Sequence, residues 1–185
     1  IKLDRRSPDA GMRINPGPVN GWYNDPSSMI EFYLNSERDG SSPVQIRYQW
    51  NDGEVRTYRD PVHIPEGTNV LKFYSVDAAG NQQPFRTETI KRDTVVPDLH
   101  YKFSSTNLTA GDTLTVSLSE TTDESKALYY SIDFGDGTNH SFNNYPSVFD
   151  HVYQTAGTYS VRMAVKDAAG NTATAETMIT VKDKS

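Results

Sequence analysis

The chain has 185 residues, of which 35% are hydrophobic, 23% charged and 11% aromatic, and its formal net charge is −6. The negative charge and the lack of a Lys or Arg cluster argue against binding to a nucleic-acid backbone, and no apolar segment is long enough to span a membrane. The absence of cysteine excludes a disulfide framework and a thiolate zinc site. What remains is a globular profile that leans toward β-structure.

Short alternating runs, each bounded by Gly, Pro, Asn or Asp, follow one another along the chain. Apolar side chains alternate with polar ones in these runs, so each predicts a half-buried strand. Nothing in the sequence predicts a convincing helix. In chain order, the runs cover residues 29–34, 44–50, 70–76, 114–118, 127–134, 159–165 and 172–181.

The phase of the alternation assigns side chains to faces. Tyr159, Val161, Met163 and Val165 point to one face of their strand, and Leu71, Phe73 and Ser75 hold the matching inward positions earlier in the chain. The opposite face of the earlier strand is less polar, because it carries Val70, Tyr74 and Val76, so we expect that face to be covered or contacted. Trp50 alternates in phase with Ile46 and Tyr48 and is assigned to a core.

The pentapeptide DAAGN occurs twice, at residues 77–81 and 167–171, and a Gly-Thr pair precedes each copy by ten residues. A period near 90 residues is too long for a solenoid repeat and fits a whole small domain. Asp, Gly and Asn suit a tight turn, so each copy is expected to close a hairpin. The sequence therefore predicts an all-β chain of two tandem Ig-like antiparallel β-sandwiches. The predicted limits are residues 1–9 for the end of an upstream domain, 10–93 for the first sandwich, 94–98 for a linker and 99–185 for the second sandwich.

The four histidines, His63, His100, His140 and His151, lie outside any recognisable nucleophile motif, so the chain is predicted not to be an enzyme. Asp133, Asp136 and His140 are close in sequence, but Phe134-Gly-Asp-Gly137 is typical of a turn whose aspartate bonds the backbone.

Calcium is the ion that loop oxygens would suit best. The candidate ligands are Asp77, Asp93 and Asp98, which we expect a sandwich to bring to one end, near the joint between the domains. The alternative is that all three are ordinary turn and linker aspartates, and no other metal or cofactor is predicted.

Surface features give a few further candidates. Trp22 and Tyr23 follow a loop-like stretch and could stack on a sugar or anchor a protein, or could instead plug the end of a sandwich. Asn107 and Asn139 each begin an N-glycosylation tripeptide.

The second half resembles the PKD repeat, a β-sandwich found in many extracellular proteins. The resemblance covers about residues 99–183, although the family usually has Trp where Ile132 stands. The motifs that carry it are Tyr130-Ser-Ile-Asp-Phe-Gly-Asp-Gly137, His151-Val-Tyr153, Ala156-Gly-Thr-Tyr-Ser-Val161 and Asp167-Ala-Ala-Gly170. His151 belongs to this pattern and is expected to make a structural hydrogen bond at the start of a strand.

The first half is similar to the Ig-like modules of bacterial and archaeal surface proteins and secreted hydrolases. The motifs that carry this resemblance are Asn20-Gly-Trp-Tyr23, Asp52-Gly53 and Phe73-Tyr-Ser-Val-Asp-Ala-Ala-Gly-Asn81.

Both resemblances imply an extracellular, cell-surface or secreted location and a spacer, adhesive or surface-layer role. The expected partners are other domains of the same protein, neighbouring copies and polysaccharide. The alternative is a pair of accessory modules, carbohydrate-binding among other roles, of a secreted hydrolase. The linker contains Pro97 and little Gly or Ser, so we expect it to hold the two domains as a semi-rigid, elongated particle.

Overall fold

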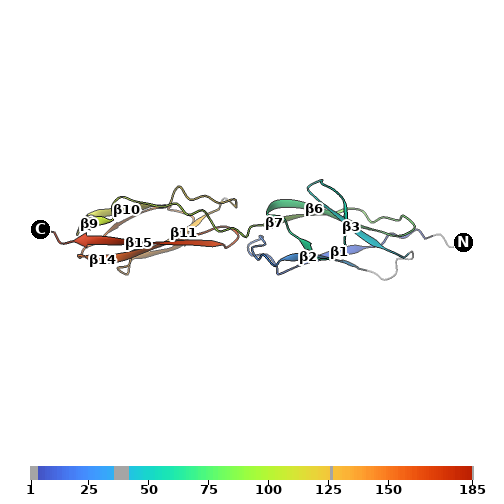
Figure 1. The fold of residues 1–185 in the computed structure, drawn as a ribbon, viewed down its shortest axis with the longest axis horizontal. Coiled ribbons are helices and arrows are strands. Elements are labelled where there is room, and N and C mark those ends of the chain that lie inside the picture. The colour runs from blue at the N-terminus through green and yellow to red at the C-terminus, as the bar shows by residue number, and fades with distance from the viewer. Residues whose placement is uncertain (1–3, 36–41, 126, 185) are drawn as a thin grey trace. The chain divides into compact units, whose positions relative to one another are not determined.

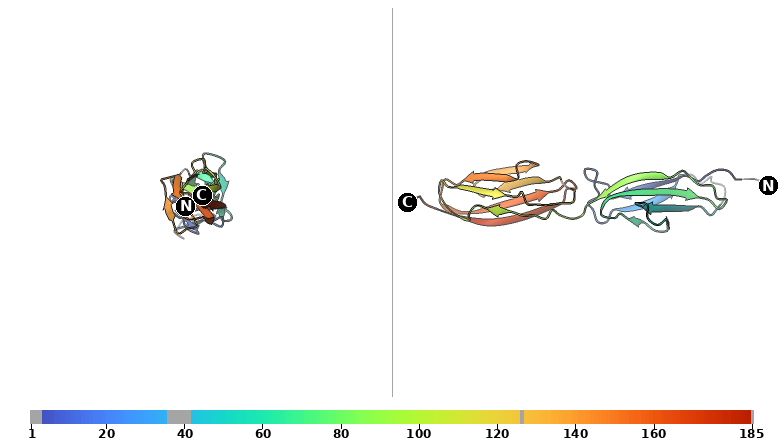
Figure 2. Two further views of the ribbon diagram at one scale, coloured as in Figure 1. Left: turned by 90° about the vertical axis from the view of Figure 1, so that its left-hand side faces the viewer. Right: turned by 90° about the horizontal axis from the view of Figure 1, so that it is seen from above.

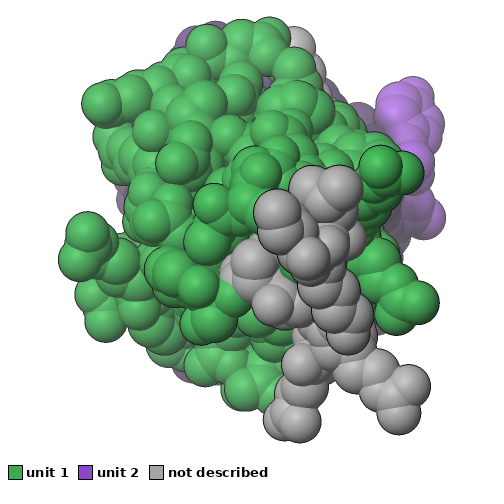
Figure 3. Space-filling model, turned by 90° about the vertical axis from the view of Figure 1, so that its right-hand side faces the viewer, with its two compact units in different colours: residues 1–94 green, residues 95–185 purple. Residues whose placement is uncertain are grey.

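The computed structural model describes residues 4–35, 42–125 and 127–184. The chain divides into two compact units, Ile1–Thr94 and Val95–Ser185, which Figure 3 draws in green and purple. The described elements of both units are strands. Among the described residues there is therefore no helix that is long and apolar enough to cross a membrane. The prediction of an all-β fold is therefore confirmed.

Unit 1 is a sandwich of two antiparallel sheets (Figure 1). One sheet has the strand order β1-β2-β5 and the other β4-β3-β6-β7. The predicted strand at 29–34 is confirmed as β2, and the run at 44–50 begins one residue later, as β3. The strands are β1 (Ala10–Asn15), β2 (Met29–Leu34), β3 (Gln45–Trp50), β4 (Arg56–Thr57), β5 (Val62–His63), β6 (Gly67–Val76) and β7 (Arg86–Arg92).

The core of unit 1 lies between its sheets and follows the alternation of β6. Leu71, Phe73 and Ser75 are buried, as predicted. Tyr74 faces the other way and is buried as well, because the ring of Phe85 packs edge-on against it with the ring centroids 4.7 Å apart. The outer face of β6 is thus covered at Tyr74 by a residue of the same unit.

Unit 2 is also a two-sheet sandwich (Figure 2). Its sheets have the strand orders β13-β10-β8 and β12-β11-β14-β15-β9. Its described strand pairs are antiparallel, as predicted, except that β9 runs parallel to β15. The exception arises because the chain passes from β8 in one sheet to β9 in the other, where it lies beside the last strand and runs in the same direction. The strands are β8 (Lys102–Phe103), β9 (Asn107–Thr109), β10 (Thr113–Ser117), β11 (Tyr129–Asp133), β12 (Asn139–Asn143), β13 (Val148–Val152), β14 (Gly157–Lys166) and β15 (Thr172–Lys182).

The alternation predicted for β14 is confirmed. Val161, Met163 and Val165 are buried in the core of unit 2, and Tyr159 packs against this core as a half-buried residue. Arg162, between them, is exposed on the outer face. The period of two therefore identified the inward face of this strand correctly.

The DAAGN pentapeptide forms the same turn in both units. In each copy the aspartate carboxylate accepts a hydrogen bond of 2.8 Å from the asparagine backbone and one of 2.9 Å from the asparagine side chain. Gly80 and Gly170 have φ angles of +86° and +95°, which glycine adopts without steric cost. In unit 2 the turn joins β14 directly to β15, whereas in unit 1 residues 82–85 intervene before β7.

Residues 4–9, expected to end an upstream domain, bond to unit 1. The Asp4 carbonyl accepts a hydrogen bond of 3.3 Å from the Asn81 side chain, and the Asp9 carboxylate forms an ion pair of 2.9 Å with Arg86. The structure places this segment with the first sandwich, and residues 1–3 lie outside the described residues. The boundary after Thr94 falls within the predicted linker.

Candidate functional site

The four histidines lie in different environments. His63 is exposed on β5, and Nε2 of His100 lies 3.1 Å from a carboxylate oxygen of Asp98. The ring of His140 packs against Phe149, with the centroids 5.4 Å apart. Among the described residues, no histidine ring is hydrogen-bonded to a serine or threonine hydroxyl, so they contain no preassembled Ser-His or Thr-His pair.

His151 makes the structural hydrogen bond that the sequence predicted, although it lies within β13 and not at its start. Its Nε2 is 2.7 Å from Asp136 Oδ2, and its ring stacks on Phe134 with the centroids 4.3 Å apart. Tyr153 is buried beside it and donates a hydrogen bond of 2.8 Å to the Phe134 carbonyl. The two rings and the carboxylate thus fasten β13 to the turn that follows β11.

Two pKa values in this cluster are shifted. Partial burial raises the pKa of Asp136, but hydrogen bonds from the Thr138 backbone and from His151 lower it by more, so the net shift is downward. Burial, followed by the nearby charge of Asp136, raises the pKa of Tyr153. The two shifts favour an ionised Asp136 carboxylate and a neutral Tyr153 hydroxyl, the forms that suit an acceptor and a donor of hydrogen bonds.

The three predicted calcium ligands do not all gather at one end. Asp77 follows the last residue of β6, whereas Asp93 follows Arg92, which pairs with Gly67 at the first residue of β6. The length of β6 therefore separates these two aspartates within unit 1, by roughly 30 Å for ten residues of strand. Asp98 belongs to unit 2 and pairs through its backbone with Thr122.

Unit 2 holds a carboxylate pair that the sequence did not single out. One carboxylate oxygen of Asp123 and one of Asp167 lie within 4.8 Å of each other. Asp123 accepts a hydrogen bond of 2.7 Å from the backbone of Ser125, and the Ser125 hydroxyl in turn accepts one of 3.4 Å from the backbone of Ala168. These bonds tie the loop before β11 to the DAAGN turn. No sequence spacing indicates the contact, because Asp123 and Asp167 come from separate loops.

The two aromatic candidates at 22 and 23 differ in environment. Residues 19–22 form a two-residue hairpin, and the Lys91 ammonium lies 5.6 Å from the centroid of the Trp22 ring. Tyr23 packs against the core of unit 1, and its backbone continues the sheet by bonding to Lys91 and Asp93. Burial, followed by the charge of Glu88, raises the pKa of Tyr23. The geometry favours a structural role for Tyr23 and leaves Trp22 half-buried beside a cation.

The two glycosylation candidates lie on strands and are exposed. Asn107 begins β9, and Asn139 begins β12. Exposure makes both side chains reachable, and their modification stays a prediction.

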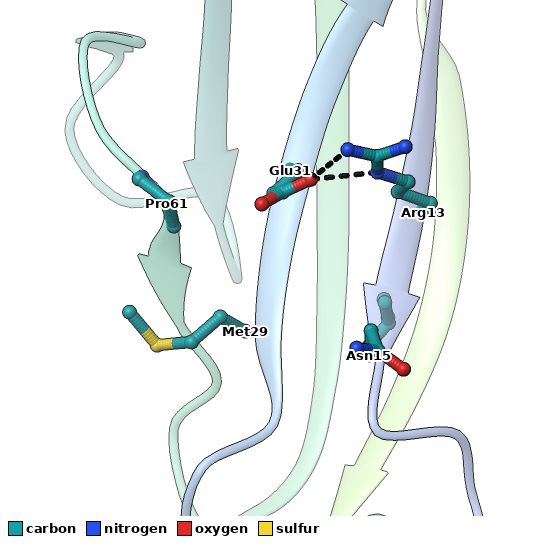
Figure 4. A pocket seen from close by; sticks show the side chains of 6 residues that line it. Arg13, Asn15, Met29, Glu31 and Pro61 are labelled. Atoms are coloured by element: carbon teal, nitrogen blue, oxygen red, sulfur yellow. Dashed lines mark hydrogen bonds and ion pairs between the residues drawn. The ribbon is translucent and has the colours of Figure 1, made fainter.

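Two of the hollows on unit 1 bear on the search for a binding site. The larger, of about 640 Å³, lies over the outer face of β1 and β2. Figure 4 shows the Arg13 guanidinium paired there with the Glu31 carboxylate, at 2.5 Å, beside Met29 and Pro61. Because Arg13 and Glu31 are direct cross-strand partners, each compensates the charge of the other.

The second hollow, of about 410 Å³, lies where the chain crosses from β4 in one sheet to β5 in the other. It is called the crossing pocket below. Tyr48 and Trp50 line it together with Arg56, Arg59 and Asp60. Trp50 packs against the core, as predicted, but remains half-buried and also faces this pocket. The alternation along a strand predicts which face of the sheet a side chain lies on, but not how close it lies to the edge of the sandwich. The sequence therefore did not predict that Trp50 faces a pocket.

Residues 95–181 match the family model of the PKD domain. No curated protein sequence matches the chain.

The solved structures that match the chain include the following three. One is a structure from work on the promiscuous specificity of carbohydrate-binding modules of the β-sandwich superfamily. It matches at 24% identity over 50% of this chain and 37% of its own, with a TM-score of 0.46. The fibronectin(III)-like modules of Clostridium thermocellum CbhA match at 13% identity over 94% of this chain and 95% of theirs, with a TM-score of 0.44. The D00-D0 domain of intimin matches at 13% identity over 95% of this chain and 100% of its own, with a TM-score of 0.39.

Proposed function

Because the C-terminal unit is a PKD domain and an Ig-like sandwich precedes it, we propose that this chain is a non-catalytic tandem module of an extracellular or cell-surface protein. Its role is to act as a spacer or as a protein–protein assembly unit, including within a surface layer. The expected partners are further domains of the same protein or neighbouring copies of it.

The proposal rests on the hydrogen bonds that fix the residues on either side of the segment between the units. In unit 1, Thr94 donates hydrogen bonds to the Glu66 carboxylate from its backbone, at 3.2 Å, and from its hydroxyl, at 2.6 Å. In unit 2, Asp98 and Thr122 exchange two backbone hydrogen bonds, of 2.9 and 3.2 Å. Residues 95–97 connect these two positions. A connecting segment this short, ending in proline, suits a module whose role is to set the distance between its neighbours.

Small-angle X-ray scattering of the 185-residue chain tests the spacer role. A compact globule of this length would have a radius of gyration of about 16 Å. We expect a clearly larger radius and a pair-distance distribution with a long tail. A radius near the compact value would contradict the spacer and would instead favour a chain that buries one domain against the other.

The non-catalytic part of the proposal is tested separately. We expect no turnover on a panel of glycoside, ester, peptide and phosphoester substrates, because the described histidines serve in packing and turn contacts or lie exposed. Turnover that is lost on replacing one of the four histidines would overturn it.

A further inference from the structure

The crossing pocket combines aromatic walls with charges that lack ion-pair partners. Arg56 and Arg59 are exposed at its rim, and neither forms an ion pair with any described residue. Three exposed arginines on strands differ from them in this respect. Arg13, Arg86 and Arg162 each pair with a carboxylate. Two uncompensated guanidinium groups at one cavity, in a chain of net charge −6, indicate a place for an anion.

The pocket is held on a fixed frame. The Tyr58 backbone donates a hydrogen bond of 2.8 Å to the Ile46 carbonyl, and the Tyr58 ring packs edge-on against Phe32 with the centroids 5.1 Å apart. Tyr58 therefore pins the segment that carries Arg56 and Arg59 on either side of it. The wall is fixed as well, because the Tyr48 ring stacks on Phe32 at 5.7 Å. Little ordering is then needed when a ligand binds.

The polar groups select among anions. Asp60 and His63 also line the pocket and are exposed, so a carboxylate acceptor lies beside the guanidinium donors. A plain anion would be repelled by Asp60, whereas a ligand with both a carboxylate and hydroxyl groups can use both sets of atoms. Trp50 and Tyr48 line the same pocket, so aromatic side chains supply apolar surface for the ring of such a ligand. The volume of about 410 Å³ falls within the usual range of small-molecule sites, about 300–1,000 Å³.

We infer that the crossing pocket of unit 1 binds an acidic saccharide. A uronic-acid residue places its carboxylate on Arg56 and Arg59 and a ring face against Trp50 or Tyr48, while Asp60 and His63 take its hydroxyl groups. This inference is independent of the spacer role, since a spacer can carry such a site and a compact chain could carry it equally.

The test is titration of the 185-residue chain with uronic-acid trisaccharides of galacturonate, glucuronate and mannuronate, and with neutral galactotriose. The chain has two tryptophans, so Trp22→Phe leaves Trp50 as the only indole and makes its fluorescence a reporter of the pocket. We expect at least one acidic trisaccharide to bind, to change the Trp50 emission and to weaken with added salt, while galactotriose binds less.

Matched arginine variants locate the site. Arg56→Ala and Arg59→Ala should each weaken binding about tenfold, the usual effect of losing one charge-assisted hydrogen bond. Arg162→Ala removes an equal charge from unit 2 and should leave binding unchanged. The melting temperature should not move in the two pocket variants, because their side chains are exposed.

Several results would overturn the inference. No binding of any acidic trisaccharide at millimolar concentration excludes the site. Equal binding of galactotriose excludes recognition of the carboxylate. An equal loss of affinity in Arg162→Ala would show that binding depends only on the net charge of the chain. Tighter binding of a peptide carboxyl terminus than of the saccharides would assign the pocket to protein ligands. None of these outcomes affects the scattering experiment, so the two proposals fail separately.

Discussion

The turn formed by the second DAAGN pentapeptide depends on the backbone conformation of one residue, Gly170. Its φ of +95° is a conformation that side chains with a Cβ rarely adopt. We expect Gly170→Val to destabilise unit 2 by about 1 kcal/mol or more, measured by chemical denaturation or calorimetry. Thr172→Val, at the first, exposed position of β15, is the matched control and should have little effect. An unchanged melting temperature together with lost binding of a partner would show that the loop is a site and not a turn.

Asp136 makes the stability of unit 2 depend on pH. Its pKa is lowered in the folded state, so its contribution to stability is complete above the unfolded value, about 3.9, and is lost as the pH falls through the folded value. Asp136→Asn should therefore lower stability at neutral pH by about 1 kcal/mol and make the loss of stability below pH 4 shallower. Denaturation at several pH values measures both effects.

The control for this prediction is Asp133→Asn. It removes one charge from the same turn without touching His151, and Asp133 accepts its hydrogen bond from Gly135 instead. It should not reproduce the change in acid profile. An acid profile of Asp136→Asn identical to that of the parent would refute the role given to the Asp136–His151 pair.

At the scale of elements, Gln83 fastens the two sheets of unit 1. It is buried, and its side-chain oxygen accepts hydrogen bonds of 2.8 Å from the Ala10 backbone and from the Ser75 hydroxyl. Its side-chain nitrogen donates to the Ala10 carbonyl at 3.2 Å. The side chain thus links the start of β1 in one sheet to β6 in the other.

Removing this link should leave buried polar groups without partners. We expect Gln83→Ala to destabilise unit 1 by about 2 kcal/mol, because the Ala10 backbone and Ser75 lose their partner inside the sandwich. Gln82→Ala changes an exposed neighbour and should be close to neutral. Thermal unfolding with separate probes for the two units distinguishes a local effect from a general one. Equal stability of the two variants would mean that water replaces the Gln83 side chain.

Sequence patterns located the strands that alternate cleanly and missed what depends on contacts between distant segments. The phase of β14 gave its buried face, and the DAAGN spacing gave both turns. Gln83 reads as a polar loop residue, and its burial follows only from the approach of Ala10, 73 positions earlier. The separation of Asp77 from Asp93 likewise follows from the pairing of β6 with β7.

The same limit applies to the candidate site. The sequence placed Trp50 in the core from its phase, and it does pack there. Its second surface, in the crossing pocket, exists because β4 and β5 belong to different sheets. Arg56 reaches the pocket because β4 pairs with β3, where it lies opposite Tyr48, and Arg59 follows where the chain leaves that sheet for β5.

For the whole molecule, the connection between the units decides how the proposed spacer behaves. Thr94 and Asp98 are fixed to their own units, and Pro97 has a restricted φ and holds Val96 toward an extended conformation. The β-branched side chain of Val95 restricts the same segment further. We therefore expect a narrow distribution of distances between one position on each unit.

Spin labels measure that distribution directly. The chain has no cysteine, so Thr87→Cys on β7 and Thr174→Cys on β15 provide two exposed and unique labelling positions. The parent linker should give one narrow distance peak. Replacing residues 95–97 by Gly-Ser-Gly keeps the length but removes the restrictions on φ, so the peak should broaden markedly. Pro97→Ala alone should broaden it partly. A parent distribution as broad as that of the Gly-Ser-Gly variant would show a freely jointed chain, and a freely jointed chain cannot set a distance.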